Sequence, residues 1–150
     1  MADLFDIESI IFDAVEKANT GLPAYKGRAE RGIQSDFIVI NSTGMMVNDQ
    51  TNKAPVVNVN LFTRLLPNGM TDAKKVKRYA RLLRESLKEP RPPKGMYFVS
   101  RIEFEADLRE EVESGFDCYN FRISVITEQR GNPQRIKQTT ATHKGAIKLN

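Results

Sequence analysis

The spacing of apolar residues predicts two helices. From residue 4 to residue 18, apolar side chains recur every three or four positions, which places them on one face of a helix. A second stripe with this spacing fills residues 72–88, where Thr71 or Asp72 provides the N-cap. Three prolines between residues 90 and 93 then end the second helix, because a proline offers no backbone N–H and clashes with the preceding turn.

Other parts of the chain have the patterns of strands. Residues 37–40 form an apolar run that is typical of a strand covered on both faces. Alternation of apolar and polar residues over 55–66, 96–108 and 119–125 predicts three further strands, and the last two form an antiparallel hairpin. Residues 41–55 are polar, and we expect a loop or hairpin tip there.

Together these elements predict a single α+β domain. The chain of 150 residues has the length of one ordinary domain. We expect residues 1–128 to form an antiparallel sheet of about four strands with two helices packed on one face, and a short extra strand near Tyr25. Residues 129–150 have few large apolar side chains, so we expect an extended C-terminal tail or arm.

The composition excludes several classes of function. A lone cysteine, Cys118, cannot form an internal disulfide, and a lone histidine, His143, leaves no Cys/His zinc site. The sequence has no glycine-rich phosphate loop and no H-E-x-x-H motif. No apolar stretch approaches the roughly 20 residues of a membrane span, and the acidic start differs from a signal peptide. We expect a soluble intracellular protein that is no enzyme and has no cofactor.

One carboxylate row keeps an enzymatic alternative open. Glu103, Glu105 and Asp107 alternate along the strand predicted over residues 96–108, and alternate strand residues project to the same face. Three carboxylates on one face could gather Mg²⁺ in a nuclease site. The acidity continues into the following turn, and no lysine follows at strand spacing. This pattern favours a solvated or partner-facing edge, with no metal bound.

Two segments carry opposite charge. The second predicted helix is rich in Lys and Arg, whereas residues 103–117 hold seven acids and one arginine. Separate patches of opposite sign suit head-to-tail contact between copies, and a head-to-tail contact that closes makes a ring. The alternative is that both patches only keep the protein soluble, or that they pair with each other within the monomer. The expected subunit-contact residues are Lys74, Lys75, Lys77, Arg78, Arg81 and Arg84 on the basic side, and Glu103, Glu105, Asp107, Glu110, Glu111 and Glu113 on the acidic side.

The order of these elements resembles that of the tail terminator and tail-completion proteins of tailed bacteriophages, and of related neck-ring proteins at the head–tail junction. The resemblance covers residues 4–127 and is one of architecture, without a signature motif, so no functional residue is carried over. It rests on the helices DIESIIFDAVEKA and TDAKKVKRYARLLRESL, the strands SDFIVI and APVVNVNLFTRLL, and the hairpin of MYFVSRIEFEADL and CYNFRISVI. The basic tail from Gln129 onward departs from the usual pattern.

The resemblance implies a structural virion protein, assembled in the host cytoplasm, that forms a ring of six or more copies in the neck or tail. Such a ring ends tail growth and joins the tail to head-completion proteins, with DNA only as cargo in the lumen. The loop 41–55 or the C-terminal tail would then reach the lumen, an adjacent ring or a neighbouring subunit. The tail residues expected to do so are Arg130, Arg135, Lys137, Lys144 and Lys148.

A nucleic-acid-binding accessory protein is the main alternative. Residues 1–128 hold 18 Lys and Arg against 19 acids, whereas residues 129–150 hold five basic residues and no acid. The basic helix over residues 72–88 and this tail would contact phosphates, with affinity that falls as salt rises. The one aromatic residue of that helix, Tyr79, lies on the apolar stripe, which disfavours stacking on bases.

Overall fold

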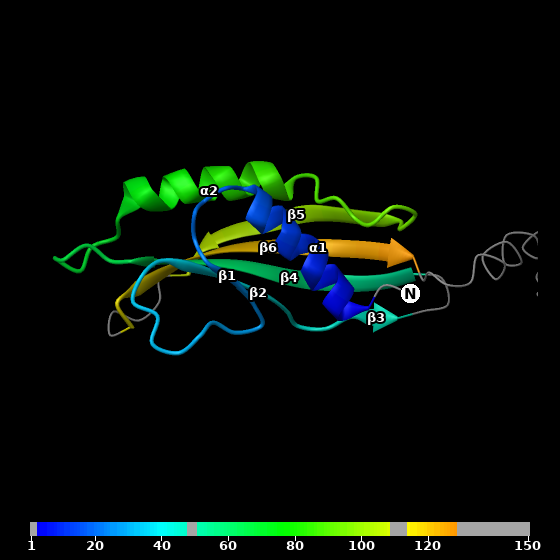
Figure 1. Cartoon of the computed structure of the whole chain (residues 1–150), viewed down its shortest axis with the longest axis horizontal. Helices are drawn as coiled ribbons and strands as arrows, with labels where there is room; N and C mark the ends of the chain where they lie inside the picture. Colours follow the sequence, from blue (N-terminus) through cyan, green and yellow to red (C-terminus); the bar gives the residue numbers. More distant parts are fainter. Residues whose placement is uncertain (1–2, 48–50, 109–113, 129–150) are drawn as a thin grey trace, which may run out of the picture.

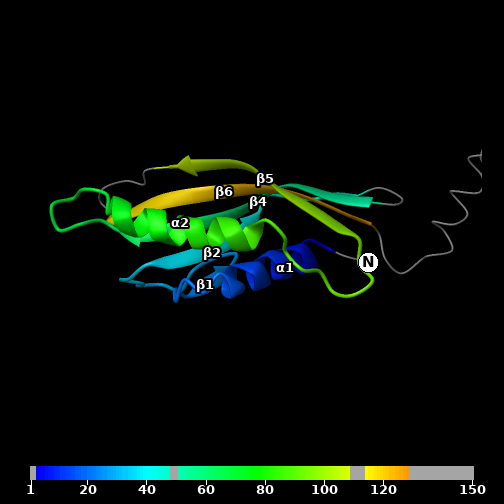
Figure 2. The same ribbon diagram turned by 90° about the horizontal axis from the view of Figure 1, so that it is seen from above.

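Two helices cover one face of a β-sheet (Figures 1 and 2). The computed structural model of the protein describes residues 3–47, 51–108 and 114–128. The elements in chain order are α1 (Leu4–Lys17), β1 (Ala24–Lys26), β2 (Phe37–Ser42), β3 (Met46–Val47), β4 (Thr51–Arg64), α2 (Ala73–Leu87), β5 (Phe98–Asp107) and β6 (Phe116–Glu128). The α+β class and both predicted helices are confirmed. The predicted C-terminal tail lies outside the described residues.

The sheet is mixed and has more strands than predicted. Its order is β1-β2-β4-β6-β5, with β3 also beside β4, so the described residues form six strands. All of these neighbours are antiparallel except β1 and β2, which are parallel. The prediction of an antiparallel sheet of about four strands is therefore wrong. Gly27 and Gly32 both have positive φ in the connection that carries the chain back to the start of β2.

Residues 41–55 were expected to form a loop or hairpin tip; the loop is wrong because strands occupy part of the segment, whereas the antiparallel pair β3 and β4 fits the hairpin alternative. β2 continues to Ser42, β3 pairs with Asn52 and Lys53, and β4 begins at Thr51, ahead of Pro55. A proline has no N–H for the ladder, and the β4–β6 register shifts between Ala54 and Val57, at this point in the strand. The strand thus continues past the proline through a shift of register.

The core lies between the helices and the inner face of the two longest strands. Val57, Val59 and Leu61 of β4 and Phe121 and Ile123 of β6 have no exposed surface. They pack against the apolar stripes of both helices in one cluster. The helices also meet each other, where the Ser86 hydroxyl of α2 donates a hydrogen bond to the Ala14 carbonyl of α1. Apolar burial on one face therefore fixes where each helix lies.

The opposite face of the sheet carries neither α1 nor α2 (Figure 2). Asparagines form a row across its centre. Asn58 donates to Asn41 at 3.0 Å, and Asn120 donates to Asn58 at 3.1 Å and to Asn60 at 2.7 Å. Beside this row, Phe37 stacks on Phe62 with ring centroids 4.8 Å apart. The asparagine amides join three strands and give the open face a polar centre.

Neither helix in the described part of the chain has the length and apolar composition needed to cross a membrane. Each helix is instead amphipathic and begins at an aspartate cap. Asp3 and Asp6 form a capping box on α1, in which each carboxylate accepts a backbone N–H of the other residue at 2.9 Å. Asp72 caps α2 by accepting the Lys75 N–H at 3.3 Å.

Two adjacent leucines of α2 test this packing. Leu83 is fully buried, so Leu83→Ala should lower the free energy of unfolding by about 2–5 kcal/mol through the cavity it leaves. Leu82 is 39% exposed, and Leu82→Ala should change it by less than about 0.5 kcal/mol. Urea denaturation in high salt, followed by circular dichroism, measures both. Equal losses in the two variants would contradict the assigned helix face.

Candidate functional site

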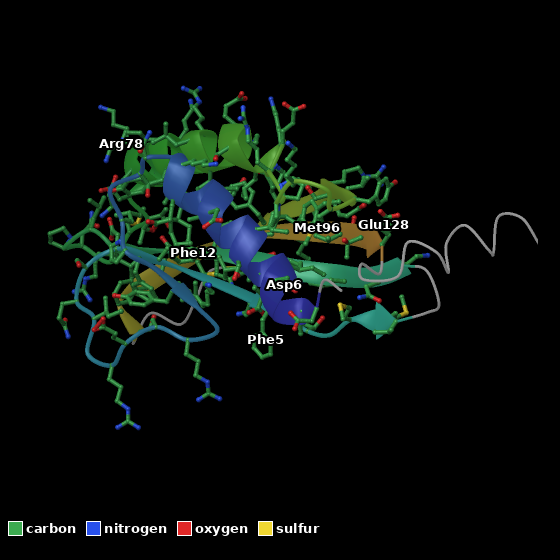
Figure 3. All side chains as sticks on the ribbon, turned by 45° about the vertical axis from the view of Figure 1, so that its right-hand side comes forward. Phe5, Asp6, Phe12, Arg78, Met96 and Glu128 are labelled. Atoms are coloured by element: carbon green, nitrogen blue, oxygen red, sulfur yellow. The ribbon has the colours of Figure 1, made fainter. Side chains whose placement is uncertain are left out.

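Helix α2 presents a row of cations to solvent on the side opposite its buried stripe. Tyr79, Ala80, Leu83 and Leu87 face the core, and the lysines and arginines occupy the rest of the helix. Figure 3 shows the basic side chains extending outward from α2, with Arg78 labelled. An amphipathic helix packed by one face leaves its polar face available for contact with other molecules.

Two of the six basic residues expected at an interface form ion pairs within the chain. Lys75 Nζ lies 3.0 Å from Asp36 Oδ2, and Arg84 lies 2.8 Å from Glu105. The other four are exposed, and none of them forms an ion pair with a residue that the structure describes. They are Lys74, Lys77, Arg78 and Arg81. We name these four residues the basic row.

Arg84 instead fastens α2 to the sheet. Its Nε and Nη2 donate to the two carboxylate oxygens of Glu105, each at 2.8 Å, and the Tyr119 hydroxyl donates to the same carboxylate at 2.7 Å. Arg84, with a smaller contribution from Tyr119, holds the pKa of Glu105 below its ordinary value, although burial opposes this. Burial and the neighbouring carboxylate raise the pKa of Tyr119. The network is a half-buried structural clamp.

A bulge in β5 divides the predicted carboxylate row. The β5–β6 register shifts between Ile102 and Phe104, so Glu103 occupies an extra position. Its carboxylate accepts hydrogen bonds from Arg101 at 3.0 Å and from Ser124 at 2.9 Å. Glu105 instead pairs with Phe121, whose side chain lies in the core beneath the helices. The prediction that Glu103, Glu105 and Asp107 share one face is therefore wrong.

The nuclease interpretation loses its geometric basis with that row. Within residues 3–47, 51–108 and 114–128, no three His, Cys, Asp or Glu side chains are placed to hold a metal ion together. Cys118 is buried, with 2% of its surface exposed, and His143 lies outside the described residues. The predicted contact residues Glu110, Glu111 and Glu113 and the five tail cations Arg130, Arg135, Lys137, Lys144 and Lys148 also lie outside them.

A group of exposed acids outside the predicted contact residues lies on α1. Residues 3–17 hold five acids and one lysine. Asp6 and Asp13 are exposed and border a hollow of about 450 Å³ between α1 and residues 91–96, in which Lys17 and Arg91 also lie. Figure 3 labels Asp6 and Met96 at this hollow. The sequence feature that could have indicated this surface is the seven-residue spacing of the two aspartates, which places them on one side of a helix.

Comparisons with known proteins do not identify the chain. No model of a known protein family matches the sequence, and no curated protein sequence matches it. The function is therefore inferred from the molecule's own surfaces, chiefly the basic row on α2 and the acids of α1.

The Arg84–Glu105 clamp generates a pH-dependent prediction. Glu105→Gln should lower the free energy of unfolding at neutral pH by about 1–3 kcal/mol, because it weakens charged hydrogen bonds to Arg84 and Tyr119. The folded-state pKa of Glu105 lies below the unfolded value of about 4.3. The carboxylate therefore stabilises the fold above that pH, and this stabilisation is lost as the pH falls through the folded-state pKa.

Urea denaturation of the wild type and of Glu105→Gln across this pH range measures the effect. The difference between the two proteins should shrink in acid. Glu85→Gln is the matched control, because Glu85 is exposed and, among the residues that the structure describes, forms an ion pair only with Lys88 at its own helix end. A difference that stays constant down to acid pH would contradict the clamp.

Proposed function

We propose that the protein is a structural subunit of a ring at the head–tail junction of a tailed bacteriophage, in the position of a tail terminator, tail-completion or neck-ring protein. Its mechanism is assembly and involves no catalytic turnover. The ring joins the tail to head-completion proteins, and DNA passes through its lumen. The observation that carries the proposal is the basic row, four exposed cations on one helix that have no ion-pair partner in the described part of the chain.

The basic row supports the proposed assembly because a row of exposed charges can set the direction in which two copies meet. Exposed ion pairs each contribute little free energy, but complementary rows of charge determine which surfaces meet and in which direction. The acidic side of α1 is a different surface of the same molecule, so copies that meet through these surfaces meet head to tail. A head-to-tail contact between identical chains generates a ring when the rotation closes.

The place in the virion is supported by the order of elements. An opening amphipathic helix, strands on either side of a connection, a middle helix and a closing hairpin are the features by which the sequence resembles the neck-ring proteins. The structure has these elements in that order, as α1, β2, β4, α2, β5 and β6. This support is architectural, and the residues that dock onto neighbouring virion proteins are not assigned.

Nucleic-acid binding is the second candidate, and the same basic row favours it. Four exposed cations on one helix can contact phosphates. Against it, Tyr79 is 8% exposed and cannot stack on a base. Contacts in this mode would therefore not distinguish one base sequence from another.

Light scattering on the purified protein tests the ring. At low salt the wild type should be a discrete species of several subunits, and its mass should fall as salt screens the charges. Lys77→Glu with Arg78→Glu should leave a folded monomer. The matched control is Arg28→Glu with Arg31→Glu, which makes the same change in charge on exposed loop residues remote in sequence from the basic row and should retain the assembly.

Electron microscopy and DNA binding separate the two candidates. The assembled species should be a ring with a lumen wide enough for duplex DNA. A monomer at every salt concentration would contradict the ring, and a monomer that binds DNA with strongly salt-dependent affinity would establish the second candidate. Equal loss of assembly in the control variant would show that net charge, and not the basic row, matters.

A further inference from the structure

We infer that the ring contact is an antiparallel packing of α1 of one copy on α2 of the next, in which Phe5 meets Leu82, Asp6 meets Arg81 and Asp13 meets Lys74. The inference rests on the proposed function, because it names the surfaces through which that ring closes. Its partner is a second copy of this chain.

Both sets of residues point away from the core. At 100° per residue, Phe5, Asp6 and Asp13 fall within about 100° of arc on α1, and so do Leu82, Arg81 and Lys74 on α2. Each arc lies roughly opposite the buried stripe of its own helix. All six residues are exposed. The two arcs are therefore available to another molecule while both helices stay packed on the sheet.

The spacing of the charges matches along the two helices. Asp6 and Asp13 are seven residues apart, as are Lys74 and Arg81. At 1.5 Å per residue each pair spans about 10.5 Å of helix axis. In an antiparallel packing, Asp6 therefore lies opposite Arg81 when Asp13 lies opposite Lys74. Ser9 lies between the two aspartates, opposite Arg78 in this register, and its hydroxyl accepts a hydrogen bond from Lys26 Nζ at 3.0 Å.

The same register brings two exposed apolar side chains together. Phe5 is 76% exposed, more than any other large apolar residue that the structure describes, and points away from the fold in Figure 3. Leu82 is 39% exposed and stands among the cations of α2. Phe5 and Asp13 are eight positions apart in the sequence, as are Lys74 and Leu82. A single register therefore brings the two apolar side chains into contact and also pairs the opposite charges.

The contact cannot form within one copy. There, α1 meets α2 through Ala14 and Ser86, near the other end of α2 from Lys74. Among the described residues, no ion pair joins an acid of α1 to a cation of α2. Because each copy has one such α1 surface and one such α2 surface, the pairing is head to tail and propagates from copy to copy.

Charge exchange within the register tests the inference on the full-length protein. Asp13→Lys alone and Lys74→Glu alone should each reduce the low-salt mass in light scattering towards the monomer. The double variant Asp13→Lys/Lys74→Glu restores opposite charges at one position and should recover the wild-type mass. The matched control Asp13→Lys/Arg81→Glu has the same net charge and leaves the α1 capping box intact, but it places like charges together at both positions, so it should stay dissociated.

Covalent capture gives a second readout that does not depend on charge. In a Cys118→Ser background, Phe5→Cys with Leu82→Cys should form disulfides between copies and give a ladder of oligomers ending at the ring size. Phe5→Cys with Arg28→Cys should give no such ladder. Circular dichroism confirms that each variant is folded.

The outcomes separate this contact from the proposed function. If the wild type assembles but both single reversals assemble equally well, or if the mismatched double variant recovers as fully as the matched one, the register is overturned and the ring stands. If the wild type is a monomer at every salt concentration and the Phe5→Cys/Leu82→Cys variant gives no ladder, both the contact and the proposed function are overturned. Recovery in the matched variant alone, with the ladder, supports both.

Discussion

The inner face of β4 and β6 is the constraint on which the rest of the molecule depends. Val57, Val59, Leu61, Phe121 and Ile123 present one continuous apolar surface, and both helices bury their stripes against it. Burial of this surface fixes the rotation of each helix about its axis. Consequently it also decides which side chains of α1 and α2 face solvent. The positions of the acidic and basic surfaces therefore follow from how the core packs.

The elements with strong periodicity could be predicted from the sequence, because burial on one face imposes its period on the residues. Both helices were found for this reason. The mixed sheet was not, since the three residues of β1 contain no information about the direction of their partner. The polar segment after β2 was taken for a loop because its asparagines have low strand propensity. In the fold, Asn41 and Asn58 bond to each other across two strands, and this pairing offsets that cost.

The candidate site was predicted in part. The basic row follows from the helical spacing of α2, but the sequence could not show that Lys75 and Arg84 pair with Asp36 and Glu105, which are distant along the chain. The acidic surface was predicted from a run of acids in the sequence. The bulge at Glu103 places this carboxylate on a different face from the other two of the row. A single extra residue in a strand reverses every later side chain, and alternation alone does not reveal it.

The bulge at Glu103 also affects how readily an edge of the sheet can pair with a strand of another chain. β5 ends the sheet on one side and β1 ends it on the other, among the strands described. A bulged strand and a strand of three residues both make poor templates for a further strand from another chain. Both edges therefore disfavour backbone pairing between chains into amyloid-like fibres. In the proposed ring, side-chain recognition is then left as the route by which one copy finds the next.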